Sequence, residues 1–498
     1  MINFTIVSAV VDDSNSQLLG AADMEIVTIG SEKYLFVAAE ADGAVSSYRL
    51  SATLPLQRVD TLAYSATSGT LAVGQITVTD VNGVLTLLPS ARYDDDVVPY
   101  QIGSLGTIDA PVSQPQNGAA VSRFTTSEAV VIGGKTYLYA AERGVSGFSG
   151  YWMQPGDSFS SEVTYSGSGL NYLGDIADFT SVKAGAQTYL FTASAFDAGL
   201  NSFSVGANGR LQLADSVAPA DASGFSLPQA LDTITVGGQA YLLMASAGTN
   251  SITVYAVDAN GGLSETDHMI DTVGTRFQDA SVLESFHYNS HSYVLAAGSD
   301  DGLTLLELNP DGTLTFLSVL ADDFNTTLKN ITDIEVVQFG TDLQAFVSSG
   351  MENGFTQIAI TIEPQGQTIV GSGAHETLTG TALGDTISGM GGSDRMYGGN
   401  GADVMQDGSG RDHFFGGAGA DVFQFVQDGT LDLIRDYEPG VDKIDLSLLP
   451  GVTDMGSLTI EAHSYGASIF AGGEEISIET VDQTGLTAFD FTANDFIF

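Results

Sequence analysis

The carboxylates best placed to do chemistry lie in a glycine-rich segment towards the C-terminal end of the 498-residue chain. Six of them recur there at every ninth position: Glu376, Asp385, Asp394, Asp403, Asp412 and Asp421. Carboxylate oxygens, together with backbone carbonyls, form the oxygen-rich shell of about six ligands that calcium takes. The residue type and the regular spacing therefore predict a row of calcium sites.

The elements that must position these carboxylates are short strands. Each nine-residue unit has a glycine-rich turn, one carboxylate and a strand centred on an apolar residue, successively Leu378, Ile387, Met396, Met405, Phe414 and Phe423. Two units are expected to make one turn of a flattened coil, so that residues eighteen apart stack. One edge would then carry Asp385, Asp403 and Asp421, and the other edge Glu376, Asp394 and Asp412.

Stacked carboxylates repel one another, and the thin apolar interior is too small to offset that repulsion together with the ordering entropy of many glycines. A divalent cation between successive turns removes the repulsion. A flexible glycine-rich linker is the alternative, but a linker does not keep a carboxylate and an apolar residue in phase over six units.

This pattern resembles the RTX, or haemolysin-type, calcium-binding nonapeptide repeat. The stretch DLIRDYEPGVDKIDLS, residues 432–447, resembles the segment that closes β-rolls in RTX proteases and lipases. In that family the neighbourhood of Asp432, Asp436 and Asp442 completes a last calcium site. The terminal ANDFIF is similar to the C-terminal signal of substrates of type I secretion systems.

The resemblance covers about residues 370–498 and implies several Ca²⁺ ions as cofactors. It also implies export from a Gram-negative bacterium to the medium or the cell surface, with the type I secretion machinery as a partner. Extracellular calcium modules bind at roughly 0.1 to 1 mM, so the repeats are expected to stay unfolded in calcium-poor cytoplasm and to fold on emergence.

The composition restricts the other partners. Sixty-one acidic residues face fifteen Lys and Arg, a net charge of −46, which argues against nucleic acid and anionic membrane surfaces. There is no cysteine, so disulfides and thiolate sites are absent. No apolar run has membrane-spanning length, and the N-terminal MINFTIVSAVVDD lacks the basic flank of a cleavable signal peptide.

The first 364 residues contain a longer repeat. A tyrosine within a short apolar run recurs at Tyr34, Tyr137, Tyr189, Tyr241 and Tyr293, and Leu85 and Gln344 fill the same column in two weaker copies. Each copy predicts four antiparallel strands, several with an Asn-Gly or Asp-Gly turn. Seven such copies predict a β-propeller, closed by the opening strand FTIVSAV on the last copy. A parallel β-helix is the main alternative.

The predicted fold class is therefore all-β, with a seven-bladed β-propeller in residues 1–364, a calcium-binding parallel β-roll in residues 365–446, and a C-terminal cap with the secretion signal in residues 447–498. The propeller copies are diffusely similar to bacterial propellers of the lactonase or YVTN-repeat type. That likeness concerns architecture, and no catalytic residue follows from it.

Candidate sites on the propeller are few. Asp23, Asp178 and Asp333 each lie eleven residues before the tyrosine column, where they would either form an acidic ring at the channel mouth or cap backbone groups. His287 and His291 flank one turn, with no third ligand identifiable, and are expected to be exposed. The Asp300-Asp301 pair is expected in a solvated loop or a further calcium site.

No catalytic motif is recognisable: GxSxG does not occur as a strand-to-helix elbow, and HExxH is absent. We therefore expect a secreted calcium-binding protein whose propeller is a binding or structural module, with an extracellular polysaccharide, a cell-surface component or its own copies as partner. The alternative is an extracellular propeller enzyme, a lactonase, polysaccharide lyase or other hydrolase, with its site at the channel mouth.

Overall fold

The computed structural model describes residues 2–13, 16–52, 55–63, 73–91, 98–111, 124–142, 144–154, 158–166, 172–221, 224–289, 291–322, 328–362, 366–481 and 483–498. These residues form strands β1 to β41 and four 3₁₀ helices: η1 (Pro219–Asp221), η2 (Ala247–Thr249), η3 (Met455–Ser457) and η4 (Ala493–Asp495). Within these ranges no helix has the length and apolar character needed to cross a membrane. The predicted all-β class is confirmed.

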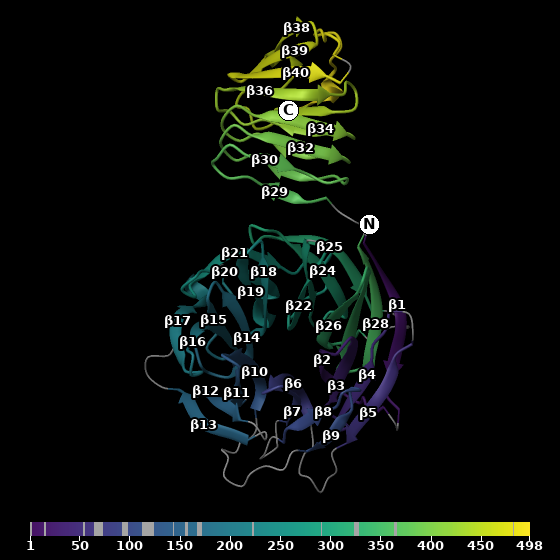
Figure 1. The fold of residues 1–498 in the computed structure, drawn as a ribbon, viewed down its shortest axis with the longest axis vertical. Helices are drawn as coiled ribbons and strands as arrows, with labels where there is room; N and C mark the ends of the chain where they lie inside the picture. Colours follow the sequence, from purple (N-terminus) through teal and green to yellow (C-terminus); the bar gives the residue numbers. More distant parts are fainter. Residues whose placement is uncertain are drawn as a thin grey trace. The chain divides into compact units, whose positions relative to one another are not determined.

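The chain divides into two compact units, the first ending at Ile362 and the second comprising the residues after it. The first unit contains seven four-stranded antiparallel sheets arranged around a common axis (Figure 1).

Six of these blades follow chain order from the innermost strand outwards. Blade 1 has β2 (Ala21–Ile29), β3 (Glu32–Ala39), β4 (Ala44–Arg49) and β5 (Gln57–Ala63), and blade 2 has β6 (Val73–Val81), β7 (Val84–Ala91), β8 (Tyr100–Ile102) and β9 (Ile108–Pro111). Blade 3 has β10 (Phe124–Ile132), β11 (Lys135–Glu142), β12 (Phe148–Gln154) and β13 (Ser158–Tyr165), and blade 4 has β14 (Ile176–Ala184), β15 (Gln187–Ser194), β16 (Gly199–Val205) and β17 (Leu211–Val217). Blade 5 has β18 (Pro228–Val236), β19 (Gln239–Ser246), β20 (Ser251–Val257) and β21 (Leu263–Ile270), and blade 6 has β22 (Val282–Tyr288), β23 (His291–Ala297), β24 (Gly302–Leu308) and β25 (Leu314–Ala321).

Blade 7 closes the ring with strands from both ends of the first unit. It consists of β26 (Ile331–Phe339), β27 (Asp342–Ser349), β28 (Gly354–Ile362) and, outermost, β1 (Ile2–Val11). Strand β1 pairs antiparallel with β28, from Ile2 opposite Ile362 to Val11 opposite Gly354. The predicted seven-bladed propeller and its closing strand are both confirmed.

The tyrosine column packs one blade against the next, which explains why it recurs. The Tyr241 hydroxyl donates a hydrogen bond to Pro310 O at 2.8 Å, and Tyr189 donates to Ala259 O at 2.8 Å, each in the β-turn of the following blade. In both turns a glycine lies against the ring: Gly312 and Gly261 have positive φ, and a Cβ added at either would collide with the tyrosine. The repeated tyrosine and the repeated turn are therefore the two sides of one contact.

The second unit is a parallel β-roll of two facing sheets. One sheet has the order β29 (Thr368–Val370), β31 (Thr386–Ser388), β33 (Val404–Gln406), β35 (Val422–Gln424), β37 (Lys443–Asp445) and β41 (Phe496–Ile497). The other has the order β30 (Thr377–Thr379), β32 (Arg395–Asn400), β34 (His413–Ala418), β36 (Leu431–Tyr437), β40 (Glu474–Thr480), β39 (Gly466–Ala471) and β38 (Thr459–His463).

The predicted stacking of residues eighteen apart is confirmed in both sheets. Thr386 lies opposite Val404 in one sheet and Arg395 opposite His413 in the other, with parallel pairing throughout the repeats. The apolar residue at the centre of each strand points into the core, where Ile387, Met396, Met405, Phe414 and Phe423 are fully buried and Leu378 packs against them.

Beyond the repeats the roll continues with longer turns. His413 pairs with Leu433 and Val422 with Lys443, so the stacking interval grows to twenty and then twenty-one residues. Strand β40 then adds in parallel to β36, and β38 and β39 follow it as an antiparallel meander. Residues 459–480 thereby lengthen one of the two sheets.

Candidate functional site

The repeat carboxylates form two ladders along the roll. On one edge Asp385 N donates to Asp403 Oδ1 at 2.7 Å, Asp403 N donates to Asp421 Oδ1 at 3.0 Å, and Asp421 N donates to Asp442 Oδ1 at 3.0 Å. The other edge runs in the same way through Glu376, Asp394, Asp412 and Asp432, with distances of 2.8, 2.7 and 2.9 Å. The structure therefore groups the six repeat carboxylates as the spacing predicted.

The second oxygen of these carboxylates is the notable feature of the ladders. The Oδ2 atoms of Asp394, Asp403, Asp412 and Asp421 are buried and accept no hydrogen bond from the described residues. Each of the four side chains is at most 1% exposed. A buried carboxylate oxygen without a donor is costly, so these atoms would suit a positively charged ligand.

The glycine turns leave room beside those oxygens. A Cβ added at Gly398 would collide with Asp403 Oδ2, and one added at Gly416 would collide with Asp421 Oδ2. The turn from Gly398 to Asp403 also needs left-handed backbone, with φ of +114° at Gly399 and +109° at Gly401. Only glycine lets the backbone approach the carboxylate so closely, which is the environment that calcium uses for mixed carboxylate and carbonyl ligation.

The electrostatics of the ladders agree with this reading. Burial, and then the charges of Asp421 and Asp385, raise the pKa of Asp403 to about 6. Burial, followed by the charges of Asp394 and Asp428, raises the pKa of Asp412 to about 6 as well. Without a cation, therefore, the folded roll disfavours the ionised form of its own carboxylates. The all-oxygen donor set, the donor-free oxygens and the glycine turns together fit calcium.

The three carboxylates after the repeats do not converge on one point. Asp432 continues the ladder of Asp412, whereas Asp442 continues the ladder of Asp421 on the opposite edge. Asp436 lies beside Asp442 and accepts hydrogen bonds from Gly416 N at 2.9 Å and Gly417 N at 3.0 Å. The reason is that β36 carries the chain from one edge of the roll at Asp432 to the other edge at Asp436.

Sequence reasoning missed Asp407, which is 1% exposed. Its Oδ1 accepts a hydrogen bond from Val426 N at 2.9 Å, and burial, then the charges of Asp412 and Asp428, raise its pKa to about 7. The signal was present in the sequence, because Asp407 stands at the start of a unit where the neighbouring units have glycine.

The predicted propeller aspartates join neighbouring blades. Asp23 Oδ2 accepts from Ile76 N of blade 2 at 2.6 Å, Asp178 Oδ2 from Leu231 N of blade 5 at 2.8 Å, and Asp333 Oδ2 from Met24 N of blade 1 at 2.6 Å. Each side chain thus satisfies a backbone donor of the next inner strand. Of the two roles that the sequence left open, an acidic ring and the capping of backbone groups, these hydrogen bonds correspond to capping.

A second column of inner-strand carboxylates was overlooked. Nine residues before the tyrosine column lie Glu25, Glu128, Asp232, Glu284 and Glu335. Burial, then Asp23 and Glu128, raise the pKa of Glu25 to about 8, although Glu25 and Glu128 belong to blades 1 and 3. Carboxylates of non-adjacent blades therefore act on one another across the centre of the propeller.

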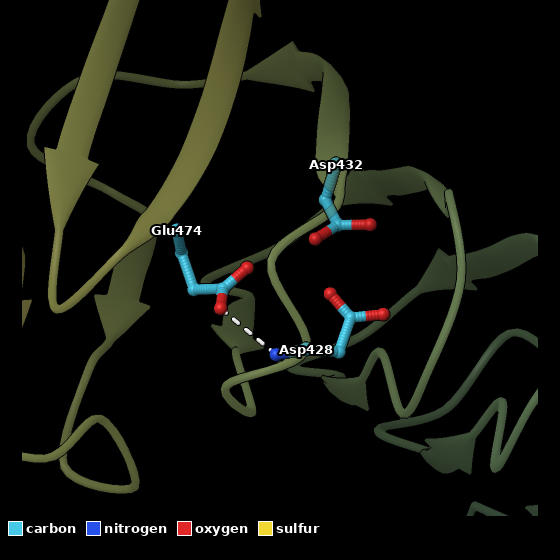
Figure 2. Close-up of side chains that lie close together, drawn as sticks. All are labelled: Asp428, Asp432 and Glu474. Carbon is cyan, nitrogen blue, oxygen red and sulfur yellow. Dashed lines mark hydrogen bonds between the residues drawn. The ribbon is translucent and has the colours of Figure 1, made fainter.

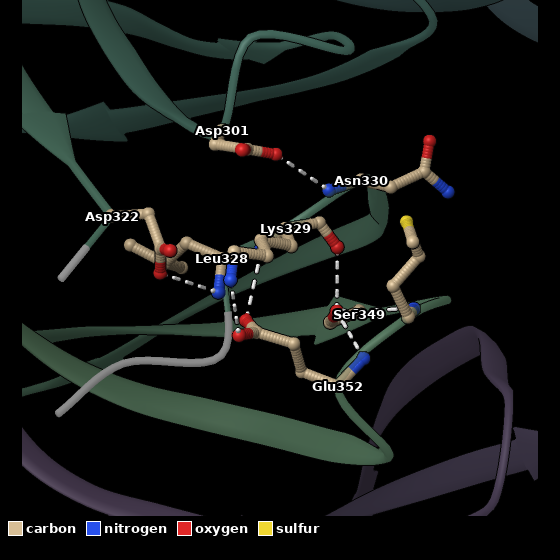
Figure 3. Close-up of polar contacts among 8 residues, drawn as sticks. Asp301, Asp322, Leu328, Lys329, Asn330, Ser349 and Glu352 are labelled. Atoms are coloured by element: carbon tan, nitrogen blue, oxygen red, sulfur yellow. Dashed lines mark hydrogen bonds and ion pairs between the residues drawn. The ribbon is translucent and has the colours of Figure 1, made fainter. Parts of the chain in front are cut away.

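Of the other predicted candidates, His287 is exposed, as expected. His291 was expected to be exposed, but its side chain is 11% exposed and its Nδ1 lies 2.7 Å from Glu307 Oε1. Figure 3 shows that Asp301 accepts a hydrogen bond from Asn330 N at 3.3 Å and Asp322 one from Leu328 N at 3.2 Å. These loop carboxylates hold the segment before β26 between blades 6 and 7.

A groove of about 700 Å³ opens on the propeller, lined by residues of β1, by residues 51, 52, 55 and 56, and by residues of blades 6 and 7. Tyr288, Gln344 and Gln357 supply polar groups to it. Gln357 Nε2 donates to Gln344 Oε1 at 3.0 Å, and Ser8 Oγ donates to Gln357 Oε1 at 2.9 Å, so the amides are held in place. The volume is typical of sites for small ligands.

Comparison with known proteins agrees with the geometry of the roll. The family model described as the RTX calcium-binding nonapeptide repeat, in four copies, matches residues 370–405 and 397–424. No curated protein sequence matches the chain.

Among solved structures, the periplasmic gluconolactonase of Pseudomonas aeruginosa is 16% identical, with a TM-score of 0.45, over 61% of this chain and 87% of its own. A proposed 6-phosphogluconolactonase from Bacteroides uniformis is 16% identical, with a TM-score of 0.44, over 60% of this chain and 85% of its own. Likenesses at this level indicate no activity for the chain. The ladders and the matching family model lead to one conclusion: residues 370–424 of the β-roll are RTX calcium-binding nonapeptide repeats.

Proposed function

We propose that the roll is the calcium-dependent folding module of a secreted protein. The observation that carries this proposal is the set of four buried Oδ2 atoms without donors, stacked along the two edges of the repeats. Asp385, Asp403, Asp421 and Asp442 would hold ions on one edge, with Asp436 beside them, and Glu376, Asp394, Asp412 and Asp432 on the other. Calcium supplies the positive charge between successive turns, so that binding free energy becomes folding free energy.

The location follows from the same chemistry. Extracellular calcium modules have dissociation constants on the order of 0.1 to 1 mM, so sites of this kind fill outside the cell and stay empty in the cytosol. We place the protein in the medium or at the surface of a Gram-negative bacterium, exported by a type I system. An unfolded roll before export and a folded roll after it are the two states of this module.

Circular dichroism of the purified chain in chelator and in calcium tests the folding step. We expect residues 371–446 to change from disordered to β on addition of calcium, with no comparable change on addition of magnesium. The same β content in chelator and in calcium would contradict the proposal. Hydrogen exchange assigns the change to the roll, since the propeller amides serve as an internal control.

The propeller is proposed to be an extracellular binding or structural module. Support comes from the groove, where Gln357 donates to Gln344 and the Tyr288 hydroxyl donates to Thr341 O, so that its polar groups are held in place. An extracellular polysaccharide, a cell-surface component or another copy of the chain are the partners to test. Light scattering with negative-stain imaging, first in chelator and then in millimolar calcium, tests self-assembly. Growth into filaments or sheets would support a structural role, and a compact monomer would count against it.

The enzyme alternative places a site among the inner-strand carboxylates. Because Asp23 and Asp333 accept backbone hydrogen bonds from the next blade, alanine at these positions is expected to weaken the propeller itself. Asparagine keeps an acceptor oxygen and removes the charge, so Asp23→Asn with Asp333→Asn is the informative pair. Loss of turnover of a lactone or glycan at unchanged thermal stability would support an enzyme.

A further inference from the structure

Three carboxylates lie close together at the end of the repeats. They do not follow the nine-residue spacing of the repeat carboxylates. Asp428 lies in the turn before β36, Asp432 is the second residue of that strand, and Glu474 begins β40. One oxygen of each lies within 4.8 Å of the others (Figure 2). Among the described residues this is the one group of three or more acidic, histidine or cysteine side chains that meets such a distance condition.

Hydrogen bonds fix the positions of these side chains. Glu474 Oε1 accepts from Asp428 N and from Gly429 N, both at 2.8 Å. Asp428 Oδ1 accepts from Thr430 N at 2.8 Å, and its Oδ2 accepts from Gly410 N. Asp432 Oδ1 accepts from Asp412 N at 2.9 Å, as the last rung of its ladder. The cluster is therefore held by the backbone of two turns, the one before β34 and the one before β36.

The second oxygen of Glu474 has no partner. Glu474 is 2% exposed, and its Oε2 accepts no hydrogen bond from the described residues. In Figure 2 this oxygen points towards Asp428 and Asp432, while the other oxygen makes the hydrogen bond to Asp428 N. A buried carboxylate oxygen aimed at two further carboxylates is repulsive unless a cation lies between them.

The geometry suits one calcium-sized ion. Calcium–oxygen bonds are about 2.3 to 2.6 Å long, so two oxygens on the same ion are at most about 5 Å apart. Three carboxylates with no nitrogen or sulfur donor among them match the preference of calcium for oxygen cages made by the protein.

We propose that a divalent cation of the calcium class bridges Asp428, Asp432 and Glu474 and thereby fastens the β39–β40 hairpin to the end of the repeats. Glu474 follows Asp432 by forty-two residues, so the ion joins segments that no repeat unit connects. The proposal rests on the proposed function only in drawing on the same extracellular calcium. The roll thus has a calcium-dependent cap as well as calcium-dependent turns.

Glu474→Gln tests the bridge, because the amide oxygen can still accept from Asp428 N while the charge is lost. Glu475→Gln is the matched control, because Glu475 is the next residue in the chain and its side chain lies outside the cluster. Native mass spectrometry of the full chain at saturating calcium counts the bound ions. We expect Glu474→Gln to bind one ion fewer than the wild type and Glu475→Gln to bind the same number.

Hydrogen exchange gives a second readout. In Glu474→Gln at limiting calcium, residues 466–480 should lose protection while residues 386–424 keep theirs. Asp428→Asn should remove the same single ion, and the double variant should lose no further ion. An unchanged ion count and unchanged protection in Glu474→Gln, or equal losses in Glu475→Gln, would overturn the inference. If the repeats bind nothing but Glu474→Gln still loses one ion, the bridge stands and the proposed folding module fails.

Discussion

Replacing Asp403 by Asn should change the stability of the roll in opposite directions with and without calcium. Asp403 is fully buried in the middle of its ladder, with Oδ1 bonded to Asp385 N at 2.7 Å and Oδ2 without a donor. Asn keeps the accepting oxygen and removes the charge that repels Asp421 and Asp385. It also removes one ligand from the proposed ion sites.

The calcium-free effect follows from the pKa. Burial and the neighbouring charges raise the pKa of Asp403 from 3.8 to about 6, and about two pKa units correspond to about 3 kcal/mol at pH 7. Relaxation of the groups around the buried charge reduces the effective cost to about 2 kcal/mol. The amide group left without an acceptor costs about 1 kcal/mol. We therefore expect the calcium-free roll to gain about 1 kcal/mol of folding free energy.

The calcium-bound effect has the opposite sign. At about 10 mM calcium, a site with a dissociation constant of about 0.1 to 1 mM stabilises the fold by about 1.4 to 2.7 kcal/mol. Losing one such ion outweighs the gain in the calcium-free state, so the variant should be less stable than the wild type by up to about 2 kcal/mol.

Two titrations followed by circular dichroism measure this. In chelator, trimethylamine oxide should fold the variant at a lower concentration than the wild type, because excluded osmolytes favour burial. In calcium, urea should unfold the variant at a lower concentration. Glu461→Gln, an exposed carboxylate outside the ladders, is the control and should move neither midpoint. A change in stability of the same sign in chelator and in calcium, seen as midpoints that move in opposite directions, would refute the charge-repulsion reasoning.

Three further predictions concern packing, blade contacts and pH. Phe414 is fully buried, with ring centroids 5.7 Å from Phe423 and 5.4 Å from Phe425; Phe414→Ala should cost about 3 to 5 kcal/mol and raise the calcium concentration at half folding, whereas exposed Leu448→Ala should not. Tyr241→Phe removes the 2.8 Å hydrogen bond to the next blade and should cost about 1 kcal/mol, read as a lower Tm of the propeller; an unchanged Tm would count against the role given to the tyrosine column. Burial raises the pKa of Glu25 to about 8 and of Asp178 to about 7, above the values near 4 in the unfolded chain. The folded propeller therefore binds more protons than the unfolded chain, and it loses stability as pH rises through about 4 to 8. Calorimetry in chelator should therefore show a higher propeller Tm at about pH 5.5 than at about pH 8.5, with a smaller difference in Glu25→Gln; a Tm that rises with pH would contradict this.

The parts of the structure that could be predicted from the sequence are those that repeat. The nine-residue period fixes the stacking interval of eighteen, because two units complete one turn of the roll. The fifty-two-residue period of the last four tyrosines reveals the blades, because the tyrosine and the turn that it touches recur together. In both cases one local contact is copied along the chain.

The contacts that could not be predicted occur once. Glu474 lies forty-two residues from Asp432 with no copy elsewhere, so no periodicity points to their meeting. The family resemblance grouped Asp436 with Asp432, but they lie towards opposite ends of β36 and accept hydrogen bonds from different turns. Glu25 and its counterparts also recur, two residues after the aspartate column, but the recurrence alone does not tell a carboxylate that accepts from the next blade from one that acts on other carboxylates across the centre.

The closure of the propeller by β1 has a consequence for how the chain folds. Ser8 and Gln357 are hydrogen-bonded although 349 positions separate them in the sequence. The whole length of β1 pairs with β28, at similarly large separations in the sequence. Contacts so distant along the chain form slowly, since the entropy of closing the loop is lost before the contact contributes any stability. Until residue 362 is available, the ring has two open sheet edges. Completion of the propeller is thus a late event in the folding of the chain.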